Sequence, residues 1–295
     1  MSEWSPLERA DAPLASHVGP FPLADFVEVW WRHRGSGIPL TVEGSGTALP
    51  CVLDEGLVRI AGDADLTDYH SPLGYDMEAM VAALLAQVPA ASVIAFDSLP
   101  QEAAVPLLKA LTGAGATVTS AEHSATMVVD LPSDDYTAGL DGKHRHEIRR
   151  KVRRFEETFG EPGLRRDDSG FETFVEMHRA APGDKGEFMT DAMEAFFRDL
   201  LRLPGAVLDL LVGGSGRPVA AAFGFEDDDT YYLYNSSFDP GAAAGSPGIV
   251  LCDSLIRAAV SSGKGRFDFL KGTEEYKRRF GAVPRPLMAI QGTSP

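Results

Sequence analysis

Residues 230–238, TYYLYNSSF, and residues 266–270, RFDFL, are β-like segments separated by a glycine-rich loop and an apolar helical pattern. The loop ends at Ser246-Pro247-Gly248, and the helical pattern runs from about Ile249 to Val260. Aromatic and β-branched residues favour strands, while glycine and proline mark the ends of elements. The stretch therefore predicts a strand, a loop, a helix and a second strand in succession.

The same order of elements occurs twice in the chain. In the second half, the β-like runs 207–212 and 218–225 flank a GGSGRP turn, and the 230–238 run follows. In the first half, β-like runs lie near 39–42, 48–53 and 57–60, and the EGSG turn at 43–46 between the first two suits a hairpin. A helical pattern, the strand SVIAFD and a helix from about residue 101 follow. Two short markers also recur: SPLG at 71–74 with SPG at 246–248, and Phe96-Asp97 with Phe267-Asp268. We therefore predict an internal duplication, with domains at 1–133 and 134–295.

The composition excludes several classes of protein. The chain has 295 residues, 27 Lys and Arg, and 43 Asp and Glu, which gives a formal net charge of −16. Such a charge argues against an electrostatically driven binder of nucleic acid or of anionic membranes. Cys51 and Cys252 are too few for a disulfide framework and lack the spacing of a zinc site. From the cysteines we therefore expect no metal site. No signal peptide or membrane-spanning apolar run is visible, so we also expect a cytoplasmic protein without membrane insertion.

Two short segments concentrate the positive charge. Residues 143–154 and 264–285 each hold seven of the 27 basic residues, and Ile148, Val152 and Phe155 give the first segment an apolar stripe. The stripe predicts a helix with one packed face and one cationic face. The charges fit either an anion site or solvated faces paired with nearby glutamates, and the sequence alone leaves both interpretations open.

Several motifs together resemble one protein family. They are KHRHEIRRKVRR, GDKGEFMTDAMEAFF, YLYNSSFDP, SPG at a helix start and FDFLKGTEEYKRRFGA, within residues 136–282. In combination they resemble the CelD-like (cellulose-biosynthesis-type) acetyltransferase branch of the GNAT superfamily, which is related to the Fem peptidyltransferases. The resemblance implies an α/β (α+β) fold of two tandem GNAT-like domains, the first degenerate, with mixed, mostly antiparallel sheets flanked by helices. It also implies transfer of an acyl group from a thioester or ester donor to an amine.

The resemblance implies a donor site at the start of the 249–260 helix. Backbone N–H groups there would hold the pyrophosphate of an acyl-CoA, a co-substrate that is most simply acetyl-CoA. We expect Gly245, Ser246 and Gly248 to form this site, with Ser246 capping the helix. The other expected donor-binding residues are Asn235, Arg145 and Arg149. The usual glycine-spaced loop of the superfamily is replaced here by residues 242–247, which keeps a different donor open.

Three residues are candidates for the chemistry. Tyr276 follows the FDFLKG strand, where the resemblance places a tyrosine that protonates the leaving thiolate. Lys277 is the candidate for stabilising the oxyanion or the donor phosphates. Asp268 is the first candidate for the base, although an aspartate within an apolar strand also suits a structural role. The alternatives for the base are Asp239, Glu274, His144, His146 and a chain of water molecules.

These residues lead to one preferred function and two alternatives. The preferred function is an N-acyltransferase that uses an acyl-CoA and acts on an amine of a small-molecule or sugar acceptor. A Fem-like transferase that depends on aminoacyl-tRNA is the second hypothesis, although the negative net charge argues against RNA binding. A non-catalytic binding module on a GNAT frame is the third. The acceptor and the oligomeric state cannot be read from the sequence.

Overall fold

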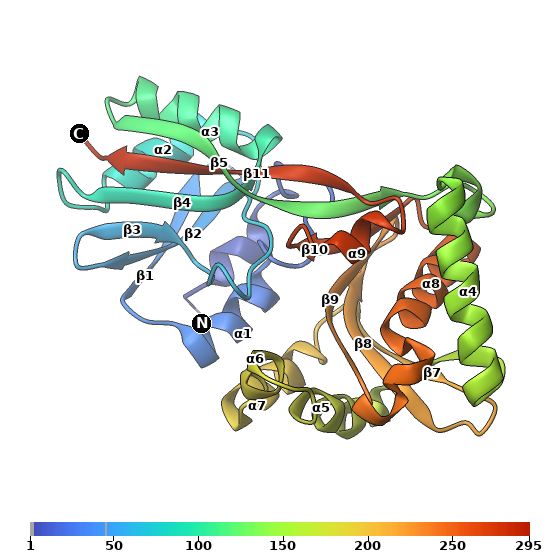
Figure 1. Ribbon diagram of the computed structural model, residues 1–295. Helices are drawn as coiled ribbons and strands as arrows, with labels where there is room; N and C mark the ends of the chain where they lie inside the picture. Colours follow the sequence, from blue (N-terminus) through green and yellow to red (C-terminus); the bar gives the residue numbers. More distant parts are fainter. Residues whose placement is uncertain (1–2, 45) are drawn as a thin grey trace. The chain divides into compact units, whose positions relative to one another are not determined.

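The computed structural model describes residues 3–44 and 46–295 and divides into two compact units. Unit 1 comprises the chain up to Thr126 together with Arg285–Pro295, and unit 2 comprises Met127–Pro284. Both units are built from strands and helices, as Figure 1 shows. The expected mixed α/β fold class is confirmed.

Unit 1 contains a sheet with helices packed on it. Its helices are the 3₁₀ helix η1 (Ser5–Arg9), α1 (Ala24–Arg34), α2 (Met77–Leu85) and α3 (Gln101–Gly113). Its strands are β1 (Ile38–Gly44), β2 (Thr47–Asp54), β3 (Leu57–Ile60), β4 (Val93–Pro100) and parts of β5 (Thr117–Asp130) and β11 (Val283–Thr293). The strand order is β1-β2-β3-β4-β11-β5. β3 and β4 pair in parallel, whereas β1 with β2, β2 with β3, and β4 with β11 are antiparallel.

Unit 2 carries the second set of strands and most of the helices. Its helices are η2 (Tyr136–Gly139), α4 (Gly142–Phe159), η3 (Asp168–Gly170), α5 (Phe171–Arg179), α6 (Asp184–Phe188), α7 (Asp191–Leu200), η4 (Pro240–Gly245), α8 (Pro247–Ser261) and α9 (Glu275–Arg278). Its own strands are β6 (Gly163–Arg166), β7 (Ala206–Val212), β8 (Pro218–Glu226), β9 (Thr230–Phe238) and β10 (Arg266–Lys271). The order is β5-β10-β9-β8-β7-β6, and β5 reaches this sheet with its last residues.

The two units repeat one succession of elements. The order β1-β2-β3-α2-β4-α3-β5 in the first half corresponds to β7-β8-β9-α8-β10-α9-β11 in the second. Each set has an antiparallel three-strand meander followed by a helix that leads to a parallel strand. Both parallel strands also contain a residue in the left-handed region, Ser98 in β4 (φ 56°) and Leu270 in β10 (φ 59°). The duplication is therefore present in the structure.

Two details differ from the expectations. SPLG at 71–74 does not begin a helix, because α2 begins at Met77, with Asp76 as its N-cap, and Leu73 instead exchanges backbone hydrogen bonds with Ala48 of β2. The strands β5 and β11 lack a clear apolar alternation and were not predicted. The hairpin turn expected at 43–46 includes Ser45, which lies outside the described residues.

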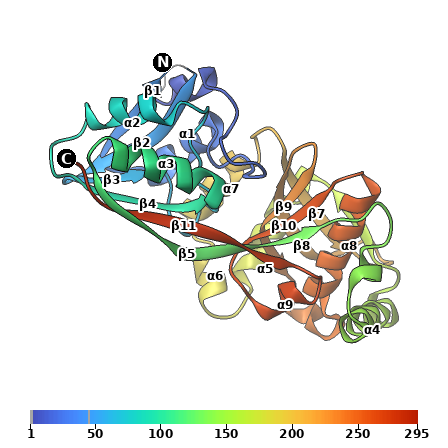
Figure 2. The ribbon, with the colours of Figure 1, turned by 90° about the horizontal axis from the view of Figure 1, so that it is seen from above.

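Helices cover both faces of the unit 2 strands. Figures 1 and 2 show α5, α6 and α7 on one side of β8 and β9, and α4 and α8 on the other. On β8, Ala220 and Ala222 belong to the core beneath α8, whereas Phe223 packs against Phe174 of α5 and Phe197 of α7. Successive side chains of a strand point to opposite faces, so both faces of β8 are buried, each against a different helical layer. β8 and β9 therefore lie between two helical layers, one with α4 and α8 and the other with α5, α6 and α7 (Figures 1 and 2).

Candidate active site

Strands β9 and β10 of unit 2 separate part of the way along their length. Their parallel register covers three pairs, from Arg266 with Thr230 to Asp268 with Tyr232. β9 then continues to Phe238 and β10 to Lys271 without further pairing between them. β9 beyond Tyr232 is therefore not paired with β10, and the two strands splay apart from this point.

A bulge in β9 lies where the two strands separate. Phe223 of β8 pairs with Asn235, but the next residue, Gly224, pairs with Leu233, so Tyr234 is an extra residue in β9. A bulge shifts the alternation of side chains along a strand. Tyr234 packs against Phe197 of α7, and Asn235 also points to the α5 and α6 side, where it contacts His178.

The turn into α8 follows the end of β9. Ser246 lies in the left-handed region (φ 56°, ψ 48°) and Pro247 begins the helix. The expectation that the Ser246 side chain caps the helix is wrong, because this backbone conformation leaves its Oγ atom without a bond to the N–H groups of α8. Its carbonyl instead accepts from the N–H groups of Ile249 and Val250. In the described chain, no protein group accepts the N–H of Gly248, so this donor is available to an anion.

Helix α4 holds this turn from one side. Lys151 donates from Nζ to the Oγ atom of Ser246 over 3.0 Å. A Cβ atom on Gly245 would lie 2.5 Å from Cε2 of Phe159, so Gly245 is required for packing against α4. A Cβ atom on Gly248 would meet only Phe238, at 3.8 Å. The loop that replaces the usual glycine-spaced motif is thus fixed by the C-terminal half of α4.

The two arginines expected at the donor site lie near the start of α4. Arg145 donates weakly to the carbonyl of Leu140, at 3.4 Å. Arg149 is exposed, and its charge makes a minor contribution to the lowered pKa of Asp135, after the hydrogen bonds from Thr137. Lys151, rather than either arginine, is the basic residue of α4 that touches Ser246.

Tyr276 presents a hydroxyl group without a partner in the described chain. Its ring packs edge-on against Phe269 of β10, with centroids 6.1 Å apart. Burial raises the pKa of the phenol far above its ordinary value, with a smaller effect from Cys252. Tyr276 therefore remains protonated at neutral pH, and its proton can be donated to a group that develops negative charge.

Lys277 and Asp268 make bonds that support the backbone. The Lys277 ammonium is buried and donates to the carbonyls of Lys271 (2.7 Å) and Gly272 (2.9 Å), and it forms an ion pair with Glu274 at 2.9 Å. With the Leu270 carbonyl at 3.4 Å as a fourth acceptor, these contacts engage all three N–H groups that a lysine carries. The Oδ1 atom of buried Asp268 accepts from the N–H of Leu270 over 2.7 Å, which stabilises the left-handed residue in β10.

A buried histidine that the sequence analysis did not select connects α5, α6 and β9. His178 is 2% exposed; its Nε2 atom lies 2.7 Å from the side-chain amide of Asn235, and its Nδ1 atom lies 2.9 Å from the carbonyl oxygen of Lys185. Burial lowers the pKa of the imidazole, so the ring is neutral at pH 7. A neutral ring has one N–H and faces two oxygen atoms, the Asn235 Oδ1 and the Lys185 carbonyl, so it donates to one of them. Donation from Nδ1 holds the Lys185 carbonyl, and Nε2 then accepts only with the Asn235 amide turned to present its NH₂ group. The sequence motif GDKGEF was a signal for this region, but nothing in it pointed to His178.

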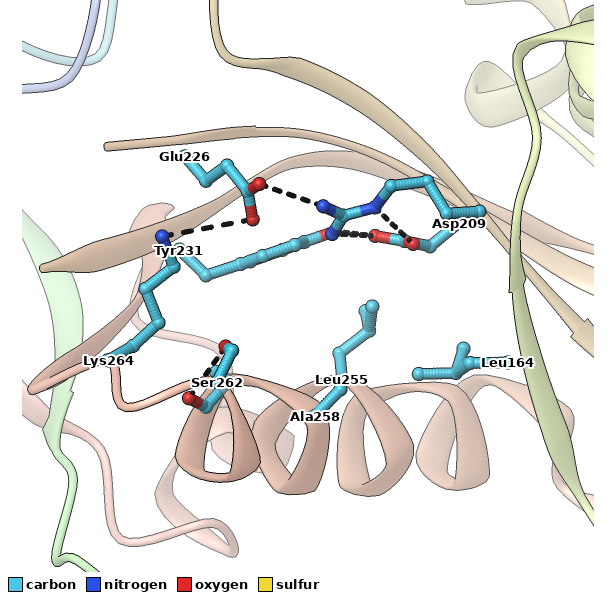
Figure 3. A pocket seen from close by; sticks show the side chains of 10 residues that line it. Leu164, Asp209, Glu226, Tyr231, Leu255, Ala258, Ser262 and Lys264 are labelled. Carbon is cyan, nitrogen blue, oxygen red and sulfur yellow. Dashed lines mark hydrogen bonds and ion pairs between the residues drawn. The ribbon is translucent and has the colours of Figure 1, made fainter. Parts of the chain in front are cut away.

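A cavity of about 330 Å³ lies at the far end of α8 from Ser246. Figure 3 shows Asp209 and Glu226 on one side of it and Leu255 and Ala258 of α8 on the other. Its charges pair among themselves, because Arg166 donates to both Asp209 and Glu226 and Lys264 approaches Glu226 at 3.9 Å. This network joins β6, β7 and β8 and includes none of the predicted site residues.

The described residues give no indication of a metal site or a membrane span. They contain no group of three or more His, Cys, Asp or Glu side chains arranged to hold a metal ion. Among the same residues, no helix has the length and apolar character needed to cross a bilayer.

Solved structures of similar fold cover nearly the whole chain. A conserved protein of unknown function from Bacteroides thetaiotaomicron superposes with a TM-score of 0.65 at 12% identity, covering 99% of this chain and 96% of the other. The C-terminal domain of a putative lysylphosphatidylglycerol synthetase from Agrobacterium fabrum gives 0.63 at 12% identity, with 98% and 92% covered. FemX gives 0.61 at 11% identity, with 97% and 94% covered. At these identities the likeness concerns the fold.

Sequence comparison points to one domain family. No curated protein matches the sequence. Residues 142–278 match the family model described as an acetyltransferase (GNAT) domain. The match begins in α4, includes the separated strands β9 and β10 and the turn into α8, and ends in α9. Residues 142–278 therefore resemble a GNAT acetyltransferase domain, and this match supports an acyltransferase.

Proposed function

We propose that the protein transfers an acyl group, most simply acetyl, from an acyl-CoA to an amine of a small-molecule or sugar acceptor. The observation that carries this proposal is the separation of β9 from β10 beyond Tyr232, with the turn into α8 at the end of β9. An extended thioester donor can enter where β10 no longer pairs with β9 and place its phosphates at the start of α8. A GNAT domain over the same residues supports this use of the site.

The donor site consists of backbone and side-chain donors in unit 2. The N–H of Gly248 and the N-terminal end of α8 favour a phosphate group. Lys151 adds a positive charge beside Ser246. The residues present fit a diphosphate, and the donor's thioester supplies the activated acyl group.

The chemical step requires a nucleophile, a proton acceptor and a proton donor. The acceptor amine attacks the thioester carbonyl, forms the new C–N bond and loses a proton to water. The C–S bond then breaks, and Tyr276 donates the proton that the leaving thiolate needs. Asp268 supports the backbone at Leu270 in this scheme and takes no proton. The free hydroxyl of Tyr276 is what favours it as the donor over Lys277, whose ammonium already has four acceptors.

Binding of the donor is tested by thermal stability. A donor present at a hundredfold its dissociation constant should add about 2.7 kcal/mol to the free energy of unfolding. We expect acetyl-CoA and free CoA to raise the melting temperature at millimolar concentration, and pantetheine, which lacks the phosphates, to raise it less. No change with acetyl-CoA, longer acyl-CoAs or CoA would rule out the CoA donor.

An aminoacyl-tRNA donor is the second candidate, and one surface favours it. Five exposed basic residues, here called the α4 cationic face, form no ion pair or hydrogen bond through their side chains within the described chain: Lys143, Arg149, Arg150, Arg153 and Arg154. The nearby Glu147 pairs with Arg279 instead. The apolar side of α4 is already packed in the core through Ile148 and Phe155, which leaves charge as the only means of binding at this face.

RNA binding is tested by its salt dependence. Five phosphate contacts predict a slope of log K against log salt of about −4. Filter binding of a tRNA mixture to the wild type and to a variant with all five residues changed to Gln would measure it. A slope near zero, or equal binding by both proteins, would remove this candidate.

A further inference from the structure

Lys185 of α6 is a charged residue without a counter-ion in unit 2. Its Nζ atom lies 6.0 Å from the centroid of the Phe238 ring, at the end of β9. Within residues 3–44 and 46–295, no carboxylate or other acceptor bonds to this ammonium. Two other lysines of unit 2 have partners, since Lys151 bonds to Ser246 and Lys277 bonds to three carbonyls and Glu274.

The backbone of Lys185 is held in place. Its carbonyl accepts from His178, which also bonds to Asn235 of β9. The next residue, Gly186, has no room for a side chain, because a Cβ atom would lie 2.2 Å from the carbonyl oxygen of Ala181. These contacts fix the backbone of Lys185 relative to β9.

The surroundings of the ammonium disfavour its charge. The residue is exposed, yet the protein around it lowers the pKa of the ammonium by desolvation. The thiol of Cys252 in α8 gives no compensating negative charge, because burial raises its pKa and keeps it neutral. A partly desolvated charge without a partner is unfavourable, and an anion supplied by a ligand would relieve that cost.

The position of Lys185 relates it to the proposed reaction. Phe238, beside the ammonium, is the same residue that a Cβ atom on Gly248 would touch at 3.8 Å. Gly248 lies in the first turn of α8, so Phe238 lies between the Lys185 ammonium and the start of this helix. The ammonium thus faces the region between the end of β9 and the start of α8.

We propose that Lys185 binds an anionic group, a carboxylate or a phosphate, of a substrate that lies between β9 and β10. This inference rests on the proposed function, since it places a substrate in that space. The anion has two sources: an acidic group on the acceptor amine, or a phosphate of the donor. His178 is a positioning residue in this arrangement, because it acts through the backbone of Lys185.

The experiment compares three single-residue variants of this chain with the wild type. Lys185→Met removes the charge and keeps the apolar stem, Lys185→Arg keeps the charge, and Lys109→Met is a control at an exposed lysine of α3. Calorimetry at low salt measures binding of CoA, pantetheine and pyrophosphate. It also measures three matched pairs of amines: phosphoethanolamine and ethanolamine, β-alanine and β-alaninamide, and glucosamine 6-phosphate and glucosamine.

We expect Lys185→Met to weaken pyrophosphate binding about tenfold, which is the size of one charge-assisted contact. Lys185→Arg and Lys109→Met should stay within about twofold of the wild type. If the donor supplies the anion, CoA binding weakens equally and pantetheine binding does not. If the acceptor supplies it, an acidic amine loses affinity, its neutral partner does not, and CoA binding is unchanged.

The inference is overturned if Lys185→Met binds pyrophosphate, CoA and every acidic amine as the wild type does. It is also overturned if neutral and acidic amines lose affinity equally, because a lost positive charge affects only the acidic ones. Failure of the proposed function has a different signature. In that case the wild type binds neither CoA nor any amine, while Lys185→Met still binds pyrophosphate more weakly than the wild type.

Discussion

The Nζ atom of Lys151 in α4 lies 3.0 Å from the Oγ atom of Ser246, the residue immediately before α8. Helix α4 therefore fixes the turn into α8. The bond keeps the Ser246 side chain turned away from the N–H groups of the helix, which it would cap in an ordinary N-cap conformation. The start of α8 therefore has a donor at Gly248 without an acceptor among the described residues, and Lys151 brings a positive charge to the neighbouring Ser246.

This relationship predicts a specific loss in Lys151→Gln. Removing the cation should weaken the binding of acetyl-CoA about tenfold, since a charge-assisted contact contributes roughly 1.5–3 kcal/mol. Calorimetric titration measures the change. Lys143→Gln, an equal loss of charge at an exposed position of the same helix, is the matched control and should alter CoA binding by less than about twofold. Equal weakening in both variants would mean that α4 acts through its overall charge.

Tyr276→Phe should remove the proton donor and leave the fold intact. The ring packs on Phe269, and in the described chain the hydroxyl has no partner to lose. We expect kcat to fall about 10²- to 10⁴-fold, as for the loss of a positioned acid. The melting temperature and the Kd for CoA should not change. A variant with near-normal turnover would move the proton transfer to water.

Two variants of Asp268 separate a structural role from a base. Asp268→Ala leaves the buried N–H of Leu270 unpaired and should lower the free energy of unfolding by roughly 1–3 kcal/mol. Asp268→Asn keeps an acceptor oxygen and should retain most of the stability and the turnover. Chemical denaturation and steady-state kinetics measure both. A folded Asp268→Asn protein without activity would instead identify Asp268 as the base.

His178 predicts how stability depends on pH. Burial lowers its pKa in the folded protein below the ordinary value of 6.5. The unfolded chain therefore binds a proton as the pH falls through about 6.5, while the folded protein stays neutral there. The free energy of unfolding consequently decreases below about pH 6.5, by at most about 1.4 kcal/mol per pH unit from this group, and its contribution is constant above that pH.

The measurement is urea denaturation of the wild type and of His178→Gln between pH 7.5 and 5.5. Glutamine can bond to the same neighbours but does not titrate. The variant should lose less stability than the wild type over this interval. Parallel curves for the two proteins would show that His178 titrates equally in the folded and unfolded states.

Local sequence determined most of the secondary structure of this protein. Aromatic and β-branched runs produced β7, β8 and β9, and the apolar stripe of α4 buries Ile148 and Phe155 as predicted. The repeated order of elements was also visible, because it depends on the succession of patterns along the chain. β5 was not visible, because its first half is polar and it becomes a strand only through its neighbours in the sheet.

Tertiary structure decided which functional groups have partners. Sequence could nominate Lys277 as a catalytic cation, but the fold places three carbonyls around its ammonium. The same fold gives Lys185 no counter-ion in the described chain and ties its backbone to β9 through His178. A hydrogen bond or ion pair depends on where distant segments place their atoms. Residue type and spacing therefore determine what a side chain can do, and the packed structure determines which side chains remain available to do it.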